Sequence, residues 1–248
     1  EGNDLISNAA VAKGDAGEDI ITDSEEAHGG DDDDILAGNV LAFGGDGADF
    51  ILGTHGDDAL HGDDGNDVVI GDRGSHAMFG GEGNDTFEVL LHAGDHDQID
   101  GGADDDVVRI RFDATLPNLS MAQVGNVYTA SAANSSLELK DVEAVLWDQA
   151  ELDAGGTAIN AAAFSGEQTV QAFAGGITFQ SGDGNDTLLG GANASVLKGG
   201  GGNDYIRGGG NGDTLFGEAG TDLFVWSGPN DVYDGGEGVD TIVVEDAD

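Results

Sequence analysis

Aspartate side chains recur at a fixed interval in the last part of the chain. From Ser181 to Val243 the sequence repeats every nine residues, and the sixth position is acidic in all rows but one. These positions are Asp186, Ser195, Asp204, Asp213, Asp222, Asp231 and Asp240. Glycines precede most of these aspartates, as in "GGGGND" at residues 199–204, and glycine turns expose backbone carbonyl oxygens. Carboxylates and carbonyls at adjustable distances form an all-oxygen site, which favours calcium over zinc or copper.

The same unit fills the first part of the chain, in rows such as "GGDGADFIL" and "GDDGNDVVI". The opening "EGNDLIS" supplies Asp4 and Ile6 at equivalent positions, and His76 replaces the aspartate in one row. Because the chain begins within a repeat, we expect it to be a segment of a longer protein. Position eight is large and apolar in every row of the last array: Leu188, Leu197, Ile206, Leu215, Phe224, Tyr233 and Ile242.

This pattern predicts how the chain positions its aspartates. The glycine-rich residues reverse the chain, and the triplet after the aspartate forms a short strand whose central side chain faces a thin core. Position seven should then face outward, either toward a partner or simply because strands favour apolar residues. Such units must stack on copies of themselves, so two nonamers make one flattened coil of two parallel strands. Stacked coils place an aspartate every ~4.8 Å along each edge, a repulsive column unless cations neutralise it.

The nonamer disappears between residues 110 and 180. Short strands are predicted at Val127–Ala130, Leu137–Leu139 and Val142–Trp147, and further β-type runs follow up to Gln180. We therefore predict an all-β fold: a parallel β-roll in two arrays, at 1–109 and 181–248, with a small all-β insert at 110–180.

Composition narrows the possible partners. The chain has 248 residues, with 7 Lys plus Arg against 50 Asp plus Glu, a net charge of -43. This charge excludes nucleic acid and anionic membranes as electrostatic partners, and no apolar run approaches the ~20 residues of a membrane span. Disorder is an alternative for such an acidic, glycine-rich chain, but its apolar residues fall at regular intervals. There is no cysteine, so disulfides and thiolate metal sites are excluded.

Other chemistry finds little support in the sequence. Six histidines occur, all in the first half, without an HExxH motif, and we expect them to be exposed loop residues. No Gly-x-Ser-x-Gly motif indicates a serine hydrolase. Carboxylate pairs as in glycosidases are abundant, but here they coincide with the repeat positions. We therefore expect no catalytic centre in this chain.

The nonamers resemble those of the repeats-in-toxin (RTX) family, Gly-Gly-x-Gly-x-Asp-x-U-x with U a large apolar residue. This resemblance implies a parallel β-roll, calcium at the turns, about ten ions in total, and export by type I secretion. It implies metal ligands at Asp4, Asp19, Asp34, Asp49, Asp58, Asp67, Asp85, Asp97, Asp106, Asp186, Asp204, Asp213, Asp222, Asp231 and Asp240. His76 and Ser195 depart from the family pattern.

An irregularity near the start predicts unequal edges. Asp4, Asp19, Asp34 and Asp49 are fifteen residues apart rather than eighteen, and the intervening segments have six residues instead of nine. The strand uses three of these six residues. Too few then remain for a glycine-rich turn that ends in aspartate and could bind calcium, called here the glycine cage. Residues 1 to 52 should therefore bind calcium on one edge only, in a column that continues through Asp67, Asp85 and Asp106. The opposite edge should start at Asp58, be interrupted at His76 and resume at Asp97.

Two functions remain open from the sequence. The first is a calcium-binding segment of a secreted or cell-surface structural or adhesive protein, which folds on calcium outside the cell. Its partners would be calcium, other copies of the chain, other extracellular proteins or polysaccharide. The alternative is the export-and-folding module of a secreted enzyme or toxin whose catalytic domain lies elsewhere, which the sequence of the parent protein would reveal. An ice-binding role is disfavoured because position five is irregular.

Overall fold

The computed structural model describes residues 2–112, 118–124, 127–132, 135–148, 158–171, 176–210 and 212–244. Every regular element in these ranges is a β-strand, which confirms the all-β prediction. In this described part of the chain there is also no helix that could cross a membrane. Nearly all neighbouring strands pair in parallel, so the fold is the predicted parallel β-solenoid.

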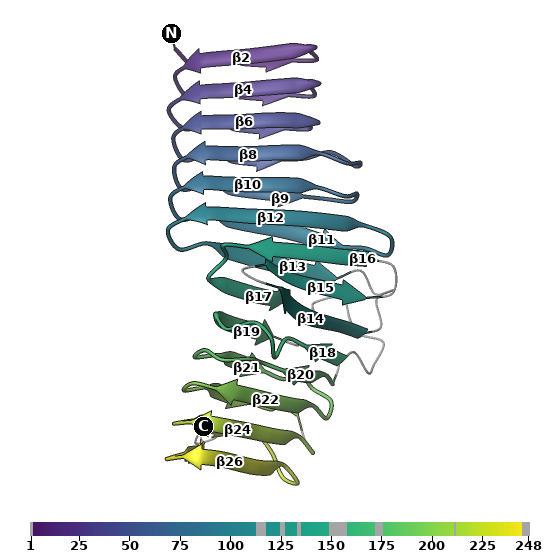
Figure 1. Cartoon of the computed structure of the whole chain (residues 1–248), viewed down its shortest axis with the longest axis vertical. Coiled ribbons are helices and arrows are strands. Elements are labelled where there is room, and N and C mark those ends of the chain that lie inside the picture. Colours follow the sequence, from purple (N-terminus) through teal and green to yellow (C-terminus); the bar gives the residue numbers. More distant parts are fainter. Residues whose placement is uncertain are drawn as a thin grey trace. The chain divides into compact units, whose positions relative to one another are not determined.

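The chain divides into two compact units. Unit 1 comprises Glu1–Ile110 with Asn134–Glu143, and unit 2 comprises Arg111–Ala133 with Ala144–Asp248. Each is built of short strands that stack along the axis of a flattened coil (Figure 1). The expected boundaries at 1–109, 110–180 and 181–248 remain a prediction.

Unit 1 has two parallel sheets, one on each side of the coil. The first follows the order β1 (Leu5–Ser7), β3 (Ile20–Thr22), β5 (Ile35–Ala37), β7 (Phe50–Leu52), β9 (Val68–Gly71), β11 (Thr86–Leu91) and β13 (Val107–Phe112). The second follows β2 (Val11–Ala16), β4 (Glu26–Asp31), β6 (Leu41–Asp46), β8 (Ala59–Asp64), β10 (Ala77–Glu82), β12 (His96–Ala103) and β16 (Ser135–Lys140).

Unit 2 repeats this arrangement. One sheet contains β17 (Ala144–Asp148), β19 (Glu167–Gln171), β21 (Thr187–Leu189), β23 (Tyr205–Arg207), β25 (Leu223–Trp226) and β27 (Thr241–Val244). The other contains β15 (Val127–Ala132), β14 (Asn118–Val124), β18 (Ala158–Asn160), β20 (Thr178–Gln180), β22 (Val196–Gly201), β24 (Thr214–Gly220) and β26 (Val232–Gly238).

The non-repeat strands lie close to where the sequence predicted them. β15 and β16 each contain the predicted segment, whereas β17 begins at Ala144, so Val142 precedes it. β14 and β15 pair antiparallel, unlike the strands of the repeats.

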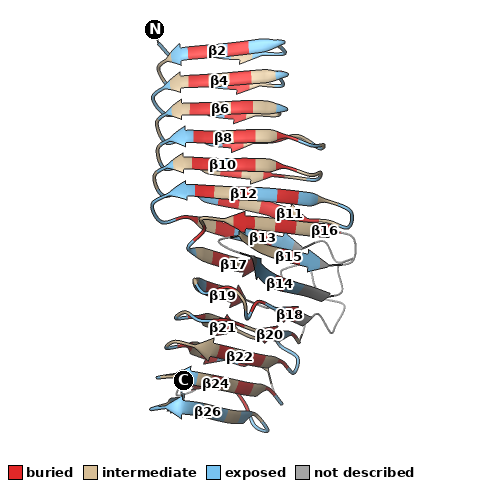
Figure 2. Ribbon diagram, in the orientation of Figure 1, coloured by how far each residue is buried: buried red, intermediate tan, exposed pale blue. Residues whose placement is uncertain are grey.

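Position eight of the repeat forms the core. Ile21, Leu36 and Ile51 are in register on adjacent strands and are 0% exposed. The preceding residues Ile20 and Ile35 are 42% and 43% exposed, which confirms that position seven faces outward. Figure 2 shows this alternation as buried bands that recur from strand to strand. Strand alternation thus leaves one dependable core position per nonamer.

Three histidines differ from the expected exposed loop residues. His28 on β4 and His61 on β8 stack with Phe43 and Phe79 on the second sheet of unit 1. Ring centroids are 4.6 to 4.9 Å apart, close to the strand spacing, so the sheet aligns these rings. The third, His76, is buried at a turn.

Candidate metal centre

A column of aspartates follows one edge of unit 1, called here the aspartate edge. Each carboxylate Oδ1 accepts a hydrogen bond from the backbone N–H of the aspartate one coil earlier, at distances between 2.5 and 2.9 Å. The column runs through Asp4, Asp19, Asp34, Asp49, Asp67, Asp85 and Asp106. This is the order predicted from the sequence, across spacings of fifteen, eighteen and twenty-one residues.

The second carboxylate oxygen in this column has no partner. Among the described residues, Oδ2 of Asp19, Asp34, Asp49, Asp67, Asp85 and Asp106 is buried without a hydrogen bond. A buried acceptor left unpaired is costly, and a buried anion is more so. A cation bound beside these oxygens would stabilise them.

The glycine turns bring backbone carbonyls to the same places. A Cβ atom on Gly44 would collide with Asp49 Oδ2 and with the carbonyl oxygen of Gly62 in the next coil. A Cβ on Gly62 would likewise meet its own row's Asp67 Oδ2 and the next coil's Gly80 carbonyl oxygen. Only glycine at this position leaves room for a carboxylate oxygen and a carbonyl oxygen together.

The pKa values of these aspartates show how unfavourable their charged form is in this column. Burial raises the pKa of Asp34 to about 6 and that of Asp49 to about 7, although a backbone N–H hydrogen bond opposes each shift. Neighbouring carboxylates, including Asp67 beside Asp49, raise the pKa further. A cation at the Oδ2 atoms would remove this penalty.

The donors fit a hard cation. Within the described ranges, no three His, Asp or Glu side chains converge as a metal site. A bound ion would thus take few carboxylates from this chain and complete its shell with turn carbonyls and water. This all-oxygen shell suits calcium, which accepts six to eight oxygens in flexible geometry.

The opposite edge of unit 1, called here the mixed edge, keeps the hydrogen-bond column with other side chains. Ser24 Oγ accepts from Ala9 N at 3.3 Å, and Asn39 Oδ1 accepts from Ser24 N at 3.0 Å. In these coils the chain reverses through Asn8, Asp23 and Gly38, each at positive φ. The short turn therefore needs a hydrogen-bond acceptor at this place, but not a charge.

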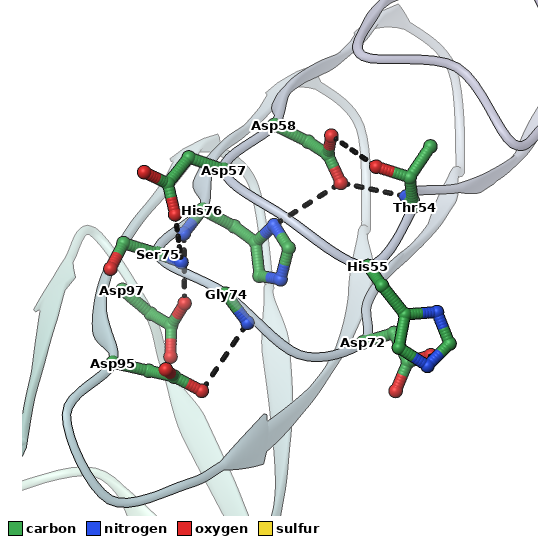
Figure 3. A network of polar contacts seen from close by, with 10 residues as sticks. All are labelled: Thr54, His55, Asp57, Asp58, Asp72, Gly74, Ser75, His76, Asp95 and Asp97. Carbon is green, nitrogen blue, oxygen red and sulfur yellow. Dashed lines mark hydrogen bonds and ion pairs between the residues drawn. The ribbon is translucent and has the colours of Figure 1, made fainter.

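His76 lies between Asp58 and Asp97 on the mixed edge (Figure 3). Its imidazole is fully buried, and Nδ1 lies 3.4 Å from Asp58 Oδ2. A Cβ atom on Gly71 would collide with this ring. In other rows, a Cβ atom on the equivalent glycine would collide with an aspartate oxygen. The imidazole thus takes the place of the carboxylate, while His76 N still donates to Asp97 Oδ1 at 2.9 Å.

Asp58 and Asp97 differ in what their oxygens do. Thr54 donates to both oxygens of Asp58, from its backbone N at 2.7 Å and from Oγ1 at 2.8 Å. Asp97 Oδ2 is buried and has no partner in the described structure, and burial raises the pKa of Asp97 to about 7. Of these two predicted ligands, Asp97 therefore has the environment of the aspartate edge.

Unit 2 has both columns that the sequence assigned. Along one edge, Asp186, Asp204, Asp222 and Asp240 accept in turn from the preceding coil, at 2.7 to 3.1 Å. Along the other, Asp213 accepts from Ser195 N and Asp231 accepts from Asp213 N. Among the described residues of unit 2, Oδ2 is buried without a partner at Asp204, Asp213 and Asp222, whereas Asp186 Oδ2 accepts from the Ser181 hydroxyl.

A second column was missed by the sequence analysis. Position-five side chains also bridge coils: Asn66 Oδ1 accepts from Asn84 N, and Asn203 Oδ1 accepts from Thr221 N, both at 2.8 Å. These bonds point the opposite way, because each side chain reaches toward the following coil. The recurrent Asn or Asp before the position-six aspartate was the available signal.

Comparison with known families agrees with this geometry. The RTX calcium-binding nonapeptide repeat model matches four times, at residues 43–75, 93–109, 180–215 and 190–224. The chain carries hemolysin-type RTX repeats. Residues 1–42 lie outside these matches, yet their shortened coils continue the same RTX aspartate column. A comparison with curated proteins gave no match.

Proposed function

We propose that this RTX segment is a calcium-driven folding module of an extracellular or cell-surface protein. It remains unfolded in the producing cell and becomes a rigid β-roll once calcium is available outside. The observation that carries this proposal is the column of buried, unpartnered Oδ2 atoms along the aspartate edge. At neutral pH the fold places carboxylates there whose charge a bound cation would neutralise.

The free energy expected from calcium binding is large enough to drive folding. Extracellular calcium modules bind with dissociation constants of ~10⁻⁴ to 10⁻³ M. At about ten times that value each site contributes ~1.4 kcal/mol, so about ten additive sites would contribute ~14 kcal/mol. This is comparable to the ~5–15 kcal/mol stability of a whole domain. At cytosolic calcium the contribution nearly vanishes, and the repulsion of a chain with net charge -43 remains.

The role we assign is structural or adhesive, with no catalytic centre in this chain. Proteins with RTX repeats are typically exported by type I secretion, which agrees with a module that folds after export. Other copies of the chain, other extracellular proteins or polysaccharide are the proposed partners. If the parent protein instead carries an HExxH, lipase or lyase motif, the segment serves as the folding module of a secreted enzyme or toxin.

The experiment is circular dichroism of the full chain in EDTA, then in millimolar calcium, with millimolar magnesium as the control. We expect an unfolded spectrum in EDTA, a β spectrum in calcium, and little recovery in magnesium, which demands a tighter octahedral shell. A β spectrum that persists unchanged in EDTA would refute calcium-driven folding.

A further inference from the structure

The aspartate edge does not end with the last repeat. After Asp106 the next coil of unit 1 is formed by residues 135–143, which have no glycine-rich nonamer. Yet Asp106 N donates to Glu143 Oε2 at 2.8 Å, as each earlier aspartate N–H donates to the next carboxylate. Glu143 thus continues the hydrogen-bond column beyond the repeats.

A one-residue offset explains why this position is a glutamate. In the repeats, the residue after each aspartate donates to the aspartate carbonyl one coil earlier, as Val107 N does to Asp85 O. Glu143 N makes this bond to Asp106 O at 3.1 Å, so Glu143 occupies backbone position seven and buried Val142 precedes it. The extra methylene of glutamate lets its carboxylate reach back to the place of an aspartate.

The neighbouring carbonyl is also replaced. In the repeats, the carbonyl oxygen beside each unpartnered Oδ2 belongs to a glycine of the next coil. A Cβ atom on Gly80, for example, would collide with both Asp85 Oδ2 and the carbonyl oxygen of Gly101. At Gly101 a Cβ would collide with Asp106 Oδ2 and with the carbonyl oxygen of Asp141. Asp141 has a φ of 48°, a left-handed conformation more usual for glycine in such a turn. Asp141 and Glu143 thereby reproduce the carbonyl and the carboxylate of a repeat turn.

The charge at this place is uncompensated. Asp106 is 0% exposed, and its Oδ2 has no hydrogen bond among the described residues. Lys140 Nζ lies 2.6 Å from Asp100 Oδ2 and 2.8 Å from Asp141 Oδ2, so this lysine is engaged by other carboxylates.

We propose that Asp141 and Glu143, outside the repeats, complete a calcium site with Asp106 at the end of the aspartate edge. The ligands are the Asp106 carboxylate, the Asp141 carbonyl and the Glu143 carboxylate, an oxygen set that suits a hard divalent cation. This inference rests on the proposed calcium binding of the repeats, and it assigns a role to a segment that the nonamer pattern does not reach.

Calcium titration of the full chain tests this site. Glu143→Gln keeps a hydrogen-bond acceptor for Asp106 N but removes the charge. The control is Glu138→Gln on β16, which makes the same change where the side chain accepts from Gln98 Nε2. By equilibrium dialysis, Glu143→Gln should bind one calcium ion fewer than wild type, and Glu138→Gln should bind the same number.

A second measurement does not depend on the variant's folding. In the wild-type chain folded in calcium, the ¹³C carbonyl resonance of Asp141 should shift when calcium is exchanged for strontium, whereas that of Glu138 on β16 should not. Equal ion numbers for Glu143→Gln and wild type, or an Asp141 carbonyl that does not respond, would overturn this site while leaving the repeat sites intact. Failure of the wild-type chain to bind any calcium would instead overturn the proposed function, and this site with it.

Discussion

The two edges of unit 1 perform the same structural task with different side chains. Both bridge successive coils with a side-chain acceptor for a backbone N–H. The aspartate edge uses only aspartates up to Asp106, whereas the mixed edge uses Ser24, Asn39 and Asp97. Only aspartate leaves a second, charged oxygen after this bond is made.

This difference separates stacking from ion binding. Ser24 and Asn39 satisfy the N–H of the neighbouring coil and are neutral, and their turns lack the glycine cage. On the aspartate edge, each carboxylate keeps a buried oxygen beside a turn carbonyl. A side-chain hydrogen bond between coils thus forms with or without a charge, and we expect calcium binding where aspartate and a six-residue glycine turn coincide.

Protonation of the buried aspartates should have the largest effect on the difference between the two edges. Burial raises the pKa of Asp49 and Asp85 to about 7, from 3.8 in an exposed carboxyl group. The metal-free fold therefore binds more protons than the unfolded chain. Its stability from these groups is complete below about pH 4 and is lost as the pH rises toward 7.

In EDTA, the β signal in circular dichroism should thus be stronger at about pH 4.5 than at about pH 7.5. In saturating calcium the same protons compete with the ion, so acid should weaken calcium binding. A metal-free chain that is more folded at neutral than at acidic pH would contradict this explanation of the aspartate edge.

The second-largest effect should come from a substitution that removes the charge of an aspartate but retains its hydrogen bond. Asp67→Asn keeps an oxygen for Asp49 N, yet it removes a carboxylate from between two ions. Two sites at about ten times their dissociation constant are worth ~3 kcal/mol, so Asp67→Asn should lose about this much stability in calcium. Urea unfolding of the variant and of wild type in millimolar calcium measures the difference.

The matched variant on the mixed edge is Asn39→Asp. It creates a carboxylate in a three-residue turn without the glycine cage, so calcium should not stabilise it beyond wild type. A calcium-dependent gain for Asn39→Asp as large as the loss for Asp67→Asn would show that the glycine turn is unnecessary.

A smaller effect should separate two aspartates of unit 2. Asp222 lies between Asp204 and Asp240 in an uninterrupted column, whereas Asp213 follows Ser195, which has no carboxylate. Asp222→Ala should therefore cost more calcium affinity than Asp213→Ala, by about one site or ~1.4 kcal/mol. If calorimetric titration shows the same loss of calcium affinity in both variants, the assignment of these aspartates to two unequal edges is wrong.

The sequence predicted the parts of this fold that depend on its period. The nonamer identified the core positions, and the fifteen-residue spacing of Asp4, Asp19 and Asp34 predicted which edge has short turns. The column order was predictable because each coil, whether of 15, 18 or 21 residues, contributes one glycine-turn aspartate to this edge.

Parts of the site that break the period were not predictable. Glu143 takes a column position through an offset backbone and a longer side chain, which no repeat alignment would find. The hydrogen bonds from Thr54 to Asp58 arise within one turn, so a spacing argument treats Asp58 like any other ligand. Such local contacts depend on coordinates rather than on the pattern.

The positions of calcium ions in unit 1 test the central claim most directly. Anomalous scattering from crystals of the full chain grown in calcium would locate each ion. We predict ions along the aspartate edge beside Asp19, Asp34 and Asp49, and none flanking residues 8–10 or 38–40 on the mixed edge. Ions at those short turns, or an aspartate edge without ions, would contradict the account.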